Sequence, residues 1–218
     1  MIANPRYTRA PQTAQVGRSR EVNMKKYAAE FIGTFVLALT VGLTLAGKFP
    51  VPTPVMAGLV LGVFVYIIGG ISGAHINPAI TFGLLSVGKI SVKDAAGYLV
   101  AQFFGGGFAM ATSRAMIERA PLTVTDSVAV GASEALGAFL LAFGVAAVVY
   151  GKAPAAASGI TIGGSLLVGI SVAAGSNGVL NPAVALGIGS LSVTYVVAPI
   201  VGAVIAMQLY RSLGESAG

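Results

Sequence analysis

Gly178-Val179-Leu180-Asn181-Pro182-Ala183-Val184 lies between two long apolar runs of this sequence. Asn181 can cap a helix, because its side-chain oxygen accepts hydrogen bonds from backbone N–H groups one turn on, and a proline fits the first turn, where no donor is needed. One Asn-Pro-Ala triplet is an ordinary way to begin a helix, but Asn77-Pro78-Ala79 repeats it 104 residues earlier (181 − 77 = 104). The two copies predict an internal repeat with a short helix at each triplet.

The composition indicates a membrane protein. Of the 218 residues, 56% are hydrophobic and 9% are charged, whereas charged residues make up about 25% of an average soluble domain. Because so few charges cannot cover a water-facing surface, we expect an integral membrane protein in contact with the lipid bilayer. The sequence has no cysteine, which excludes disulfide and thiol chemistry. The net charge of +6 is not gathered on one folded face, so we expect no nucleic-acid partner.

Six apolar runs are long enough to cross a membrane, for which about 20 residues are needed. They lie near residues 27–46, 54–72, 94–113, 128–150, 157–175 and 192–211. Two connections, 73–90 and 176–191, are too apolar for surface loops and too short to cross and return. We expect them to be re-entrant segments with half-helices at 77–86 and 181–190, buried in protein or lining a wet cavity, because lipid cannot satisfy such a backbone. The predicted fold class is an all-α integral membrane protein with six transmembrane helices and two re-entrant half-helices.

The two halves align without a gap at the same offset of 104. Ala29-Glu30-Phe31 falls on Ser133-Glu134-Ala135, and the two Asn-Pro-Ala triplets coincide. Each half holds three spans, an odd number, so we expect an inverted 3+3 repeat. The predicted divisions are a disordered basic tail at 1–24, a membrane domain at 25–212 with repeats of about 25–125 and 126–212, and a short tail at 213–218.

The positive residues favour one orientation in the membrane. With both termini inside, ten Lys and Arg residues lie on the inner side, and three (Lys48, Arg114 and Arg119) lie on the outer side. Positive residues are enriched in cytoplasmic loops. Both termini are therefore predicted to be cytoplasmic, in a plasma membrane or a bacterial inner membrane.

Four polar residues within apolar segments are candidates for a functional role: Glu30, Glu134, Gln102 and His75. A charge inside a span costs at least about 2.5–3.5 kcal/mol, which makes an ion or proton pathway the first hypothesis for the two glutamates. Their equivalent positions in the repeat favour instead a scaffold role, in which each carboxylate accepts hydrogen bonds from backbone N–H groups of a re-entrant segment. Gln102 would act similarly. His75 could sense pH, although a histidine in a tight loop is more often fixed by hydrogen bonds, and no metal site is expected with one histidine and no cysteine.

Inversion of the halves would point the N-termini of the two half-helices at each other near the membrane midplane. Each N-terminus carries roughly half a positive charge, so the pair would repel cations. The side-chain N–H groups of Asn77 and Asn181 could donate to a water or hydroxyl oxygen, which would interrupt a proton-conducting chain of waters.

Glycines in the spans are predicted to serve packing. Gly58 and Gly62, and also Gly159 and Gly163, have the spacing that allows helices to cross closely. Gly105-Gly106-Gly107 lies inside an apolar run with no Lys-Ser/Thr after it, which excludes a phosphate-binding loop.

Ser72-Gly73-Ala74-His75-Ile76-Asn77-Pro78-Ala79, Ala29-Glu30-Phe31 and Asn181-Pro182-Ala183 resemble the motifs of the aquaporin, or major intrinsic protein, family. The resemblance covers residues from about 25 to 212, including both halves. It implies one pore in each protomer of a homotetramer and no cofactor. The permeants that it implies are water and, as in the aquaglyceroporins, glycerol, urea or other small uncharged solutes.

The sequence departs from this family at the outer constriction. The second motif usually continues with an arginine that donates to the permeant and repels cations, and here the residue is Val184. Counting without gaps from each motif places the other constriction positions at Ala57, Gly169 and Gly178. Together the four residues predict a wide, apolar constriction.

We therefore expect a passive channel for water and small uncharged solutes such as glycerol or urea, and not an enzyme, because no nucleophile–base pair or metal set is present. The alternatives are a water channel of ordinary selectivity, a secondary transporter and a structural junction protein built on the same fold.

Overall fold

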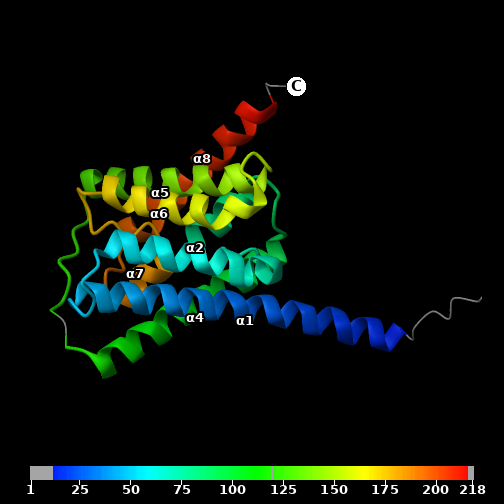
Figure 1. The fold of residues 1–218 in the computed structure, drawn as a ribbon, viewed down its shortest axis with the longest axis horizontal. Coiled ribbons are helices and arrows are strands. Elements are labelled where there is room, and N and C mark those ends of the chain that lie inside the picture. The colour runs from blue at the N-terminus through cyan, green and yellow to red at the C-terminus, as the bar shows by residue number, and fades with distance from the viewer. Residues whose placement is uncertain (1–11, 119, 216–218) are drawn as a thin grey trace, which may run out of the picture.

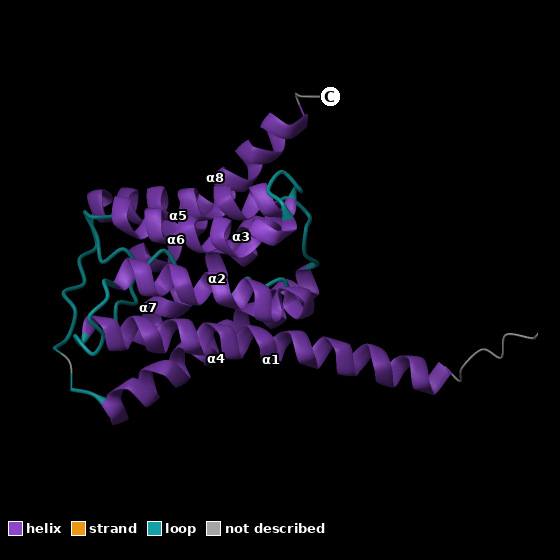
Figure 2. Ribbon diagram, in the orientation of Figure 1, coloured by secondary structure: helices purple, strands orange, loops and turns teal. Residues whose placement is uncertain are grey.

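The computed structural model describes residues 12–118 and 120–215, with side chains over 24–118 and 120–214. Every regular element in these ranges is helical (Figures 1 and 2). The helices are α1 (Gln12–Leu45), α2 (Thr53–Ser72), α3 (Pro78–Ser86), α4 (Val92–Met116), α5 (Val128–Val149), a 3₁₀ turn η1 (Ala155–Ala157), α6 (Ser158–Val172), α7 (Pro182–Ile188) and α8 (Val193–Glu215).

The predicted fold class is confirmed. Helices α1, α2, α5 and α8, together with η1 and α6, provide five segments long and apolar enough to cross a membrane. Helix α4 has 25 residues and is about 37 Å long at 1.5 Å per residue, which is also enough to cross; Gln102 and three glycines make it less apolar than the others. The short helices α3 and α7 begin at the two Asn-Pro-Ala triplets.

Helix α1 begins at Gln12, well before the predicted start near residue 27. The predicted disordered tail at 1–24 is therefore helical from residue 12 onward, and residues 1–11 lie outside the described residues. The segment 12–24 has no proline and one glycine, so it offers little resistance to continuing the helix. At the other end, α8 continues to Glu215, into the predicted tail.

The packing repeats between the two halves. Helix α1 packs on α4 as α5 packs on α8, and α3 packs on α8 as α7 packs on α4. Helices α2 and α6 pack against each other between the halves. The N-terminal part of α1 and the C-terminal end of α8 leave the bundle on the same side (Figure 1), which we call the inner end. An even number of crossings places both termini there.

Glycines set the closest helix contacts. A Cβ atom at Gly58 would lie 2.6 Å from the carbonyl oxygen of Gly163, and one at Gly62 would lie 2.8 Å from that of Gly159. Only glycine allows α2 and α6 to approach this closely. Gly106 has the same role between α4 and α7, because a Cβ there would collide with the carbonyl of Ala183.

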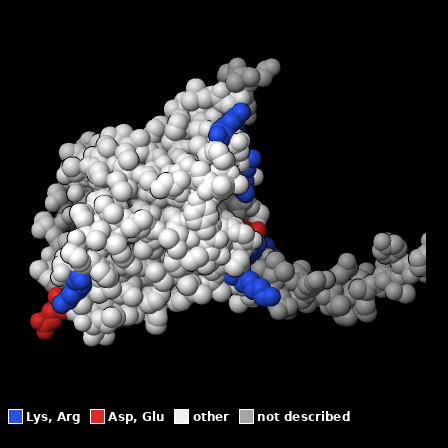
Figure 3. Space-filling view, in the orientation of Figure 1, with Lys and Arg blue, Asp and Glu red and all other residues white. Residues whose placement is uncertain are grey.

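The outer surface of the bundle is apolar. Leu59, Ile67, Phe104, Ile160 and Val197 are each more than half exposed. Charged side chains gather at the two ends, and the side that faces the viewer between them carries none (Figure 3). A soluble monomer rarely exposes so much apolar surface, so this face contacts lipid or other protein within a membrane.

Candidate pore

The two half-helices begin in the same way. Asn77 precedes α3, and its Oδ1 accepts a hydrogen bond from the N–H of Ala79 at 2.8 Å. Asn181 precedes α7, and its Oδ1 accepts from Ala183 at 3.0 Å and from Val184 at 3.2 Å. Both asparagines cap their helices as the sequence predicts.

The same side chains join the two halves of the protein. Nδ2 of Asn77 donates to the carbonyl of Leu180 at 3.0 Å, and Nδ2 of Asn181 donates to the carbonyl of Ile76 at 2.9 Å. An amide nitrogen carries two hydrogens. Each asparagine therefore keeps one N–H available for a molecule beside it, and both side chains line the cavity described below.

Buried carboxylates hold the re-entrant segments. Glu30 accepts hydrogen bonds from the hydroxyl of Ser72 at 2.6 Å, from the N–H groups of His75 and Ile76 at 2.9 and 2.6 Å, and from Gln102 at 2.7 Å. No part of the Glu30 side chain is exposed. Its four donors include two consecutive backbone N–H groups, which is the geometry of a loop anchor.

Glu134 makes the equivalent contacts at an offset of 104. It accepts from the hydroxyl of Ser176 at 2.7 Å and from the N–H groups of Val179 and Leu180 at 2.9 and 2.6 Å. The position equivalent to Gln102 is Ala206 (102 + 104), so this carboxylate has one donor fewer. Both glutamates therefore bind the backbone of a re-entrant segment, as the scaffold role predicts, and neither lines the cavity.

His75 lies in a network of side chains rather than alone. Its Nδ1 is 3.1 Å from Oγ1 of Thr81, whose hydroxyl is also bonded to Gln102. Its ring packs edge-on against Tyr98, with ring centroids 5.0 Å apart. The imidazole is thus fixed by neighbouring side chains, and only its backbone N–H contacts Glu30.

The re-entrant backbone is strained where it turns. Ala74, Ile76 and Leu180 have φ values of 52°, 36° and 57°, in the left-handed region that costs non-glycine residues about 1–3 kcal/mol. Ile76 and Leu180 donate to Glu30 and Glu134, and their carbonyls accept from the opposite asparagine. The glutamates and asparagines therefore hold these residues in the strained conformation.

A cavity of about 1140 Å³ passes between the two asparagines. Leu45 and Thr53 line it at the outer end, and Lys89 and Asp94 line it at the inner end. Between these ends its walls are mostly aliphatic. The cavity therefore reaches from one end of the bundle to the other.

The structure places three of the four predicted constriction residues on this cavity. Ala57, Gly178 and Val184 line it, but Gly169 does not. A Cβ at Gly169 would lie 2.6 Å from the carbonyl of Gly137 on α5, so this glycine serves helix packing. The neighbouring Ile170 lines the cavity in its place.

Gly169 does not line the cavity because it faces α5, and α6 presents the next residue, Ile170, to the cavity instead. Helix α2 lines the cavity at residues 53, 57, 61 and 65, and α6 lines it at 158, 162, 166 and 170, which is an offset of 105 (170 − 65). Gly33 on α1 contacts Phe64 on α2, and its repeat equivalent, Gly137 on α5, contacts Gly169 on α6. The contacted residues of α2 and α6 are thus also 105 apart (169 − 64). The offset between α2 and α6 is therefore one residue larger than the offset between Asn77 and Asn181.

A family model described as Major intrinsic protein matches residues 17–210. The chain belongs to the major intrinsic protein family. It is 34% identical over 216 residues to the glycerol uptake facilitator protein-like 6 of Lactiplantibacillus plantarum, over 88% of this chain and 99% of the relative. It is 31% identical over 243 residues to aquaporin AqpM of Methanothermobacter thermautotrophicus, over 87% and 97% of the two chains.

A solved structure shares the fold. The X-ray structure of the aquaglyceroporin from Plasmodium falciparum superimposes with a TM-score of 0.72 at 22% identity, and covers 89% of this chain and 98% of that one. Members of the major intrinsic protein family are membrane channels rather than enzymes, so this chain is an integral membrane channel for water and small solutes.

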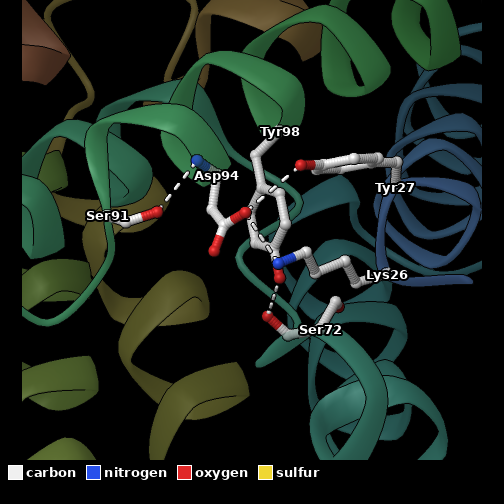
Figure 4. Close-up of polar contacts among 6 residues, drawn as sticks. All are labelled: Lys26, Tyr27, Ser72, Ser91, Asp94 and Tyr98. Atoms are coloured by element: carbon white, nitrogen blue, oxygen red, sulfur yellow. Dashed lines mark hydrogen bonds and ion pairs between the residues drawn. The ribbon is translucent and has the colours of Figure 1, made fainter. Parts of the chain in front are cut away.

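Sequence reasoning missed a polar cluster at the inner mouth of this family member (Figure 4). Asp94 pairs with Lys26 at 2.7 Å and accepts from the hydroxyl of Tyr27 at 3.2 Å. Tyr98, one turn further along α4, donates to the carbonyl of Ser72 at 2.6 Å. The cluster ties the first helix and the end of α2 to α4. Its residues come from three helices and share no motif, so the sequence alone gives no signal for it.

In the ranges with described side chains, no three His, Asp or Glu residues come together in a way that could hold a metal ion. Apart from Lys89 and Asp94 at the inner mouth and the imidazole of His75, the polar groups that the major intrinsic protein fold brings to the cavity are amides, backbone groups and hydroxyls. Groups of this kind can solvate an uncharged molecule.

Proposed function

We propose that this protein conducts water and small uncharged solutes such as glycerol or urea passively through its cavity. The observation that carries the proposal is the pair of linked asparagines, each capping a half-helix and each lining the same cavity from the opposite half. A permeant passing between them meets one free N–H from each side. That geometry selects molecules with an oxygen or nitrogen lone pair.

Ions are excluded at the same place. The N-termini of α3 and α7 meet where Asn77 and Asn181 lie, and each helix contributes roughly half a positive charge. Moving an ion from water into a low-dielectric medium costs on the order of 20 kcal/mol by the idealised Born estimate. The mostly aliphatic wall provides no carboxylate between the mouths to offset this cost. Metal cations are therefore expected not to pass.

The outer constriction is proposed to be apolar but not wide. Its wall is Ala57, Gly178, Val184 and Ile170, all of which line the cavity. Ile170 carries the bulk that Gly169 lacks, and its Cγ2 lies 3.1 Å from the position of a Cβ on Gly178. Ile170 thus limits the size of the solutes that can pass at this level. Val184 stands where the arginine usual in the family would repel cations.

The assembly and orientation complete the proposal. The chain is proposed to form a homotetramer with one pore in each protomer, and its exposed apolar faces provide surface for neighbouring copies. Both termini are proposed to be cytoplasmic, in a plasma or bacterial inner membrane, because Lys89, Lys93, Lys152 and Arg211 all lie in or beside the connections and helix ends at the inner end.

Stopped-flow light scattering of proteoliposomes tests this function. The purified chain should raise water flux, and the flux of at least one of glycerol and urea, above protein-free liposomes, without saturation and with a low activation energy. The double variant Asn77→Leu/Asn181→Leu removes both free N–H groups together with the caps and the links between the halves, so its flux is compared only after circular dichroism shows that it is folded. Flux that saturates, or that requires a sodium or proton gradient, would show that the protein is a transporter.

A further inference from the structure

An apolar groove lies on the outer surface of the bundle between α5 and α6. Its space is about 680 Å³, within the range of about 300–1,000 Å³ that is typical of small-molecule sites. Helix α5 lines it from Leu140 to Ala147, α6 lines it from Ile160 to Val168, and Tyr210 of α8 contributes to its wall. None of the residues that line the groove also lines the pore cavity, so the groove is a separate site.

Glycine leaves the groove open. A Cβ atom at Gly164 would meet no atom within 4 Å, although Gly164 lies on the wall between the exposed side chains of Ile160 and Val168. On the opposite wall, a Cβ at Gly144 would collide with the side chain of Ser165, so α5 and α6 approach closely beneath the open space. The groove is therefore a space that another molecule can fill.

The groove has the length of one leaflet of a membrane. It extends about 10 Å along α5, from Leu140 to Ala147, and about 12 Å along α6, from Ile160 to Val168, at 1.5 Å per residue. Ala147 and Ile160 lie two residues from the inner ends of their helices. The hydrocarbon of a bilayer is about 30 Å thick, so that of one leaflet is about 15 Å. The groove thus lies at the depth of the acyl chains of the inner leaflet.

Two lysines lie beyond the inner end of the groove. The backbone N–H of Lys152 donates to the carbonyl of Ala147 at 2.9 Å, which places this exposed residue next to the groove wall. The ring of Tyr210, which lines the groove, stacks on that of Tyr150 with centroids 5.8 Å apart. Nζ of Lys89 lies 4.6 Å from the centre of the same Tyr150 ring. The inner end of the groove is therefore positively charged.

The charge at this end decides which partner fits. The connections 87–91 and 150–157, which carry Lys89 and Lys152, contain no acidic residue, and the charged side chains visible at the inner end are mostly Lys and Arg (Figure 3). A second copy of the chain in the same orientation would bring its own inner-end lysines to this depth, where like charges repel. A phospholipid with an anionic headgroup complements both parts, because its acyl chain is apolar and its phosphate is attracted by lysine.

We propose that the groove between α5 and α6 binds an anionic phospholipid, with an acyl chain along the groove and the phosphate at Lys152 and Lys89. The site lies outside the pore, and the proposal does not depend on which solutes the pore conducts. The connection that carries Lys152 also forms part of the inner mouth of the pore, through Gly151 and Pro154. The bound lipid therefore contacts a segment that shapes this mouth.

Native mass spectrometry of the purified full chain in a neutral detergent measures the binding of single lipids. Dioleoyl phosphatidylglycerol and dioleoyl phosphatidylcholine have the same acyl chains, but only the first has a net negative charge. Dihexanoyl phosphatidylglycerol keeps the charged headgroup on short chains. The unmodified protein should bind the dioleoyl phosphatidylglycerol more tightly than either of the other two lipids.

Substitutions separate the headgroup from the acyl chain. Lys152→Gln should weaken the binding of dioleoyl phosphatidylglycerol about fivefold, the effect of one basic residue beside an anionic headgroup, and should leave phosphatidylcholine binding unchanged. Lys48→Gln is the matched control, because it removes the same charge from an exposed lysine at the outer end of the bundle. Gly164→Leu extends into the open space of the groove and should weaken the binding of both dioleoyl lipids.

A preference for dioleoyl phosphatidylglycerol that is reduced in Lys152→Gln but not in Lys48→Gln supports the site. Equal binding of all three lipids, or equal losses in the two lysine variants, would overturn it, because either result indicates attraction by net charge or detergent exchange alone. A weaker oligomer in Gly164→Leu with unchanged lipid binding would also overturn it, in favour of a second copy of the chain in the groove. None of the three substituted positions lines the pore cavity, so flux measurements test the channel function separately.

Discussion

Replacing Glu30 with glutamine tests whether the carboxylates hold the re-entrant segments. One oxygen of Glu30 accepts from the hydroxyl of Ser72 and the N–H of His75, and the other accepts from the N–H of Ile76 and the amide of Gln102. Glutamine can offer an oxygen at only one of these two places. The hydroxyl and the amide can reverse their roles, but a backbone N–H cannot, so one backbone donor is left facing another donor.

The expected cost follows from that count. One buried, unpaired donor costs about 1–3 kcal/mol. Glu30→Leu leaves two backbone donors unpaired and should cost about twice as much, roughly 2–6 kcal/mol. Because domains are stable by about 5–15 kcal/mol, the glutamine variant should fold with reduced stability, and the leucine variant should be close to its limit. Glu134→Gln should behave as Glu30→Gln does, because Glu134 also holds two backbone N–H groups.

The assay is thermal unfolding of the purified protein in detergent, followed by circular dichroism, together with water flux at equal reconstitution. The expected order of apparent unfolding temperature is unmodified protein, then Glu30→Gln, then Glu30→Leu. Glu118→Gln is the matched control, because Glu118 is exposed in the connection between α4 and α5 and should change nothing. If Glu30→Gln and Glu134→Gln melt and conduct as the unmodified protein does, the carboxylates do not anchor these segments.

Three further changes have defined outcomes. Val184→Arg restores a positive charge and bulk on the cavity wall, so it should lower both glycerol flux and proton leak, and no change in pH-gradient decay or in flux would place the residue outside the path. Gly163→Val should lower the unfolding temperature, because a Cβ there meets the backbone of α2 and such overpacking costs about 1–3 kcal/mol. Gly164→Ala, with open space around it, should leave the unfolding temperature unchanged. Asp126 accepts from the hydroxyl of Ser192 at 2.6 Å and from the N–H of Thr194 at 3.2 Å, which caps the start of α8. The bond from Ser192 holds the pKa of Asp126 below its usual value, so this stabilisation is present above about pH 3.9 and is lost as the pH falls through the lowered pKa of the folded protein. Asp126→Ala should lower the unfolding temperature at neutral pH, and a difference that persisted at pH 2 would argue against this cap.

The sequence predicts the elements of this fold because a membrane leaves few choices. Apolar runs of about 20 residues must be helices, and two apolar segments too short to span must be re-entrant. The starts of α3 and α7 agree with the predicted caps because Asn-Pro allows one local conformation there. The start of α1 was missed because a polar helix outside the membrane has no hydrophobic pattern to mark it.

Side-chain positions on α6 could not be predicted in the same way. The repeat offset is 104 at Glu30 and Glu134 and at both asparagines, but it is 105 between α2 and α6. A single-residue change of this kind rotates a helix by about 100° relative to an ungapped count. It turns Gly169 toward α5 and brings Ile170 to the cavity. Only contacts between helices reveal such a shift, because the residues around it are all small or aliphatic.

The two halves repeat their anchors but not the contacts around them, and this difference bears on selectivity. The inner segment is tied through Gln102 and Thr81 to His75; of these three residues only His75 lines the cavity, and the other two are fully buried. The outer segment has alanines at the two equivalent positions, 206 and 185. It is tied instead through Asn177, which lines the cavity and bonds to Tyr195, Thr123 and Ser190.

Asn177 lines the cavity, but its backbone N–H and both side-chain hydrogens are used within the protein. The outer constriction can therefore be apolar while its loop is held by hydrogen bonds to Glu134, Tyr195 and Asn181. A substitution on the wall, at Val184 or Ile170, should consequently change which solutes pass without loosening the segment. A substitution at Tyr195 should loosen the segment, and by moving the carbonyls of Gly178 and Val179 it should lower the flux of all solutes together.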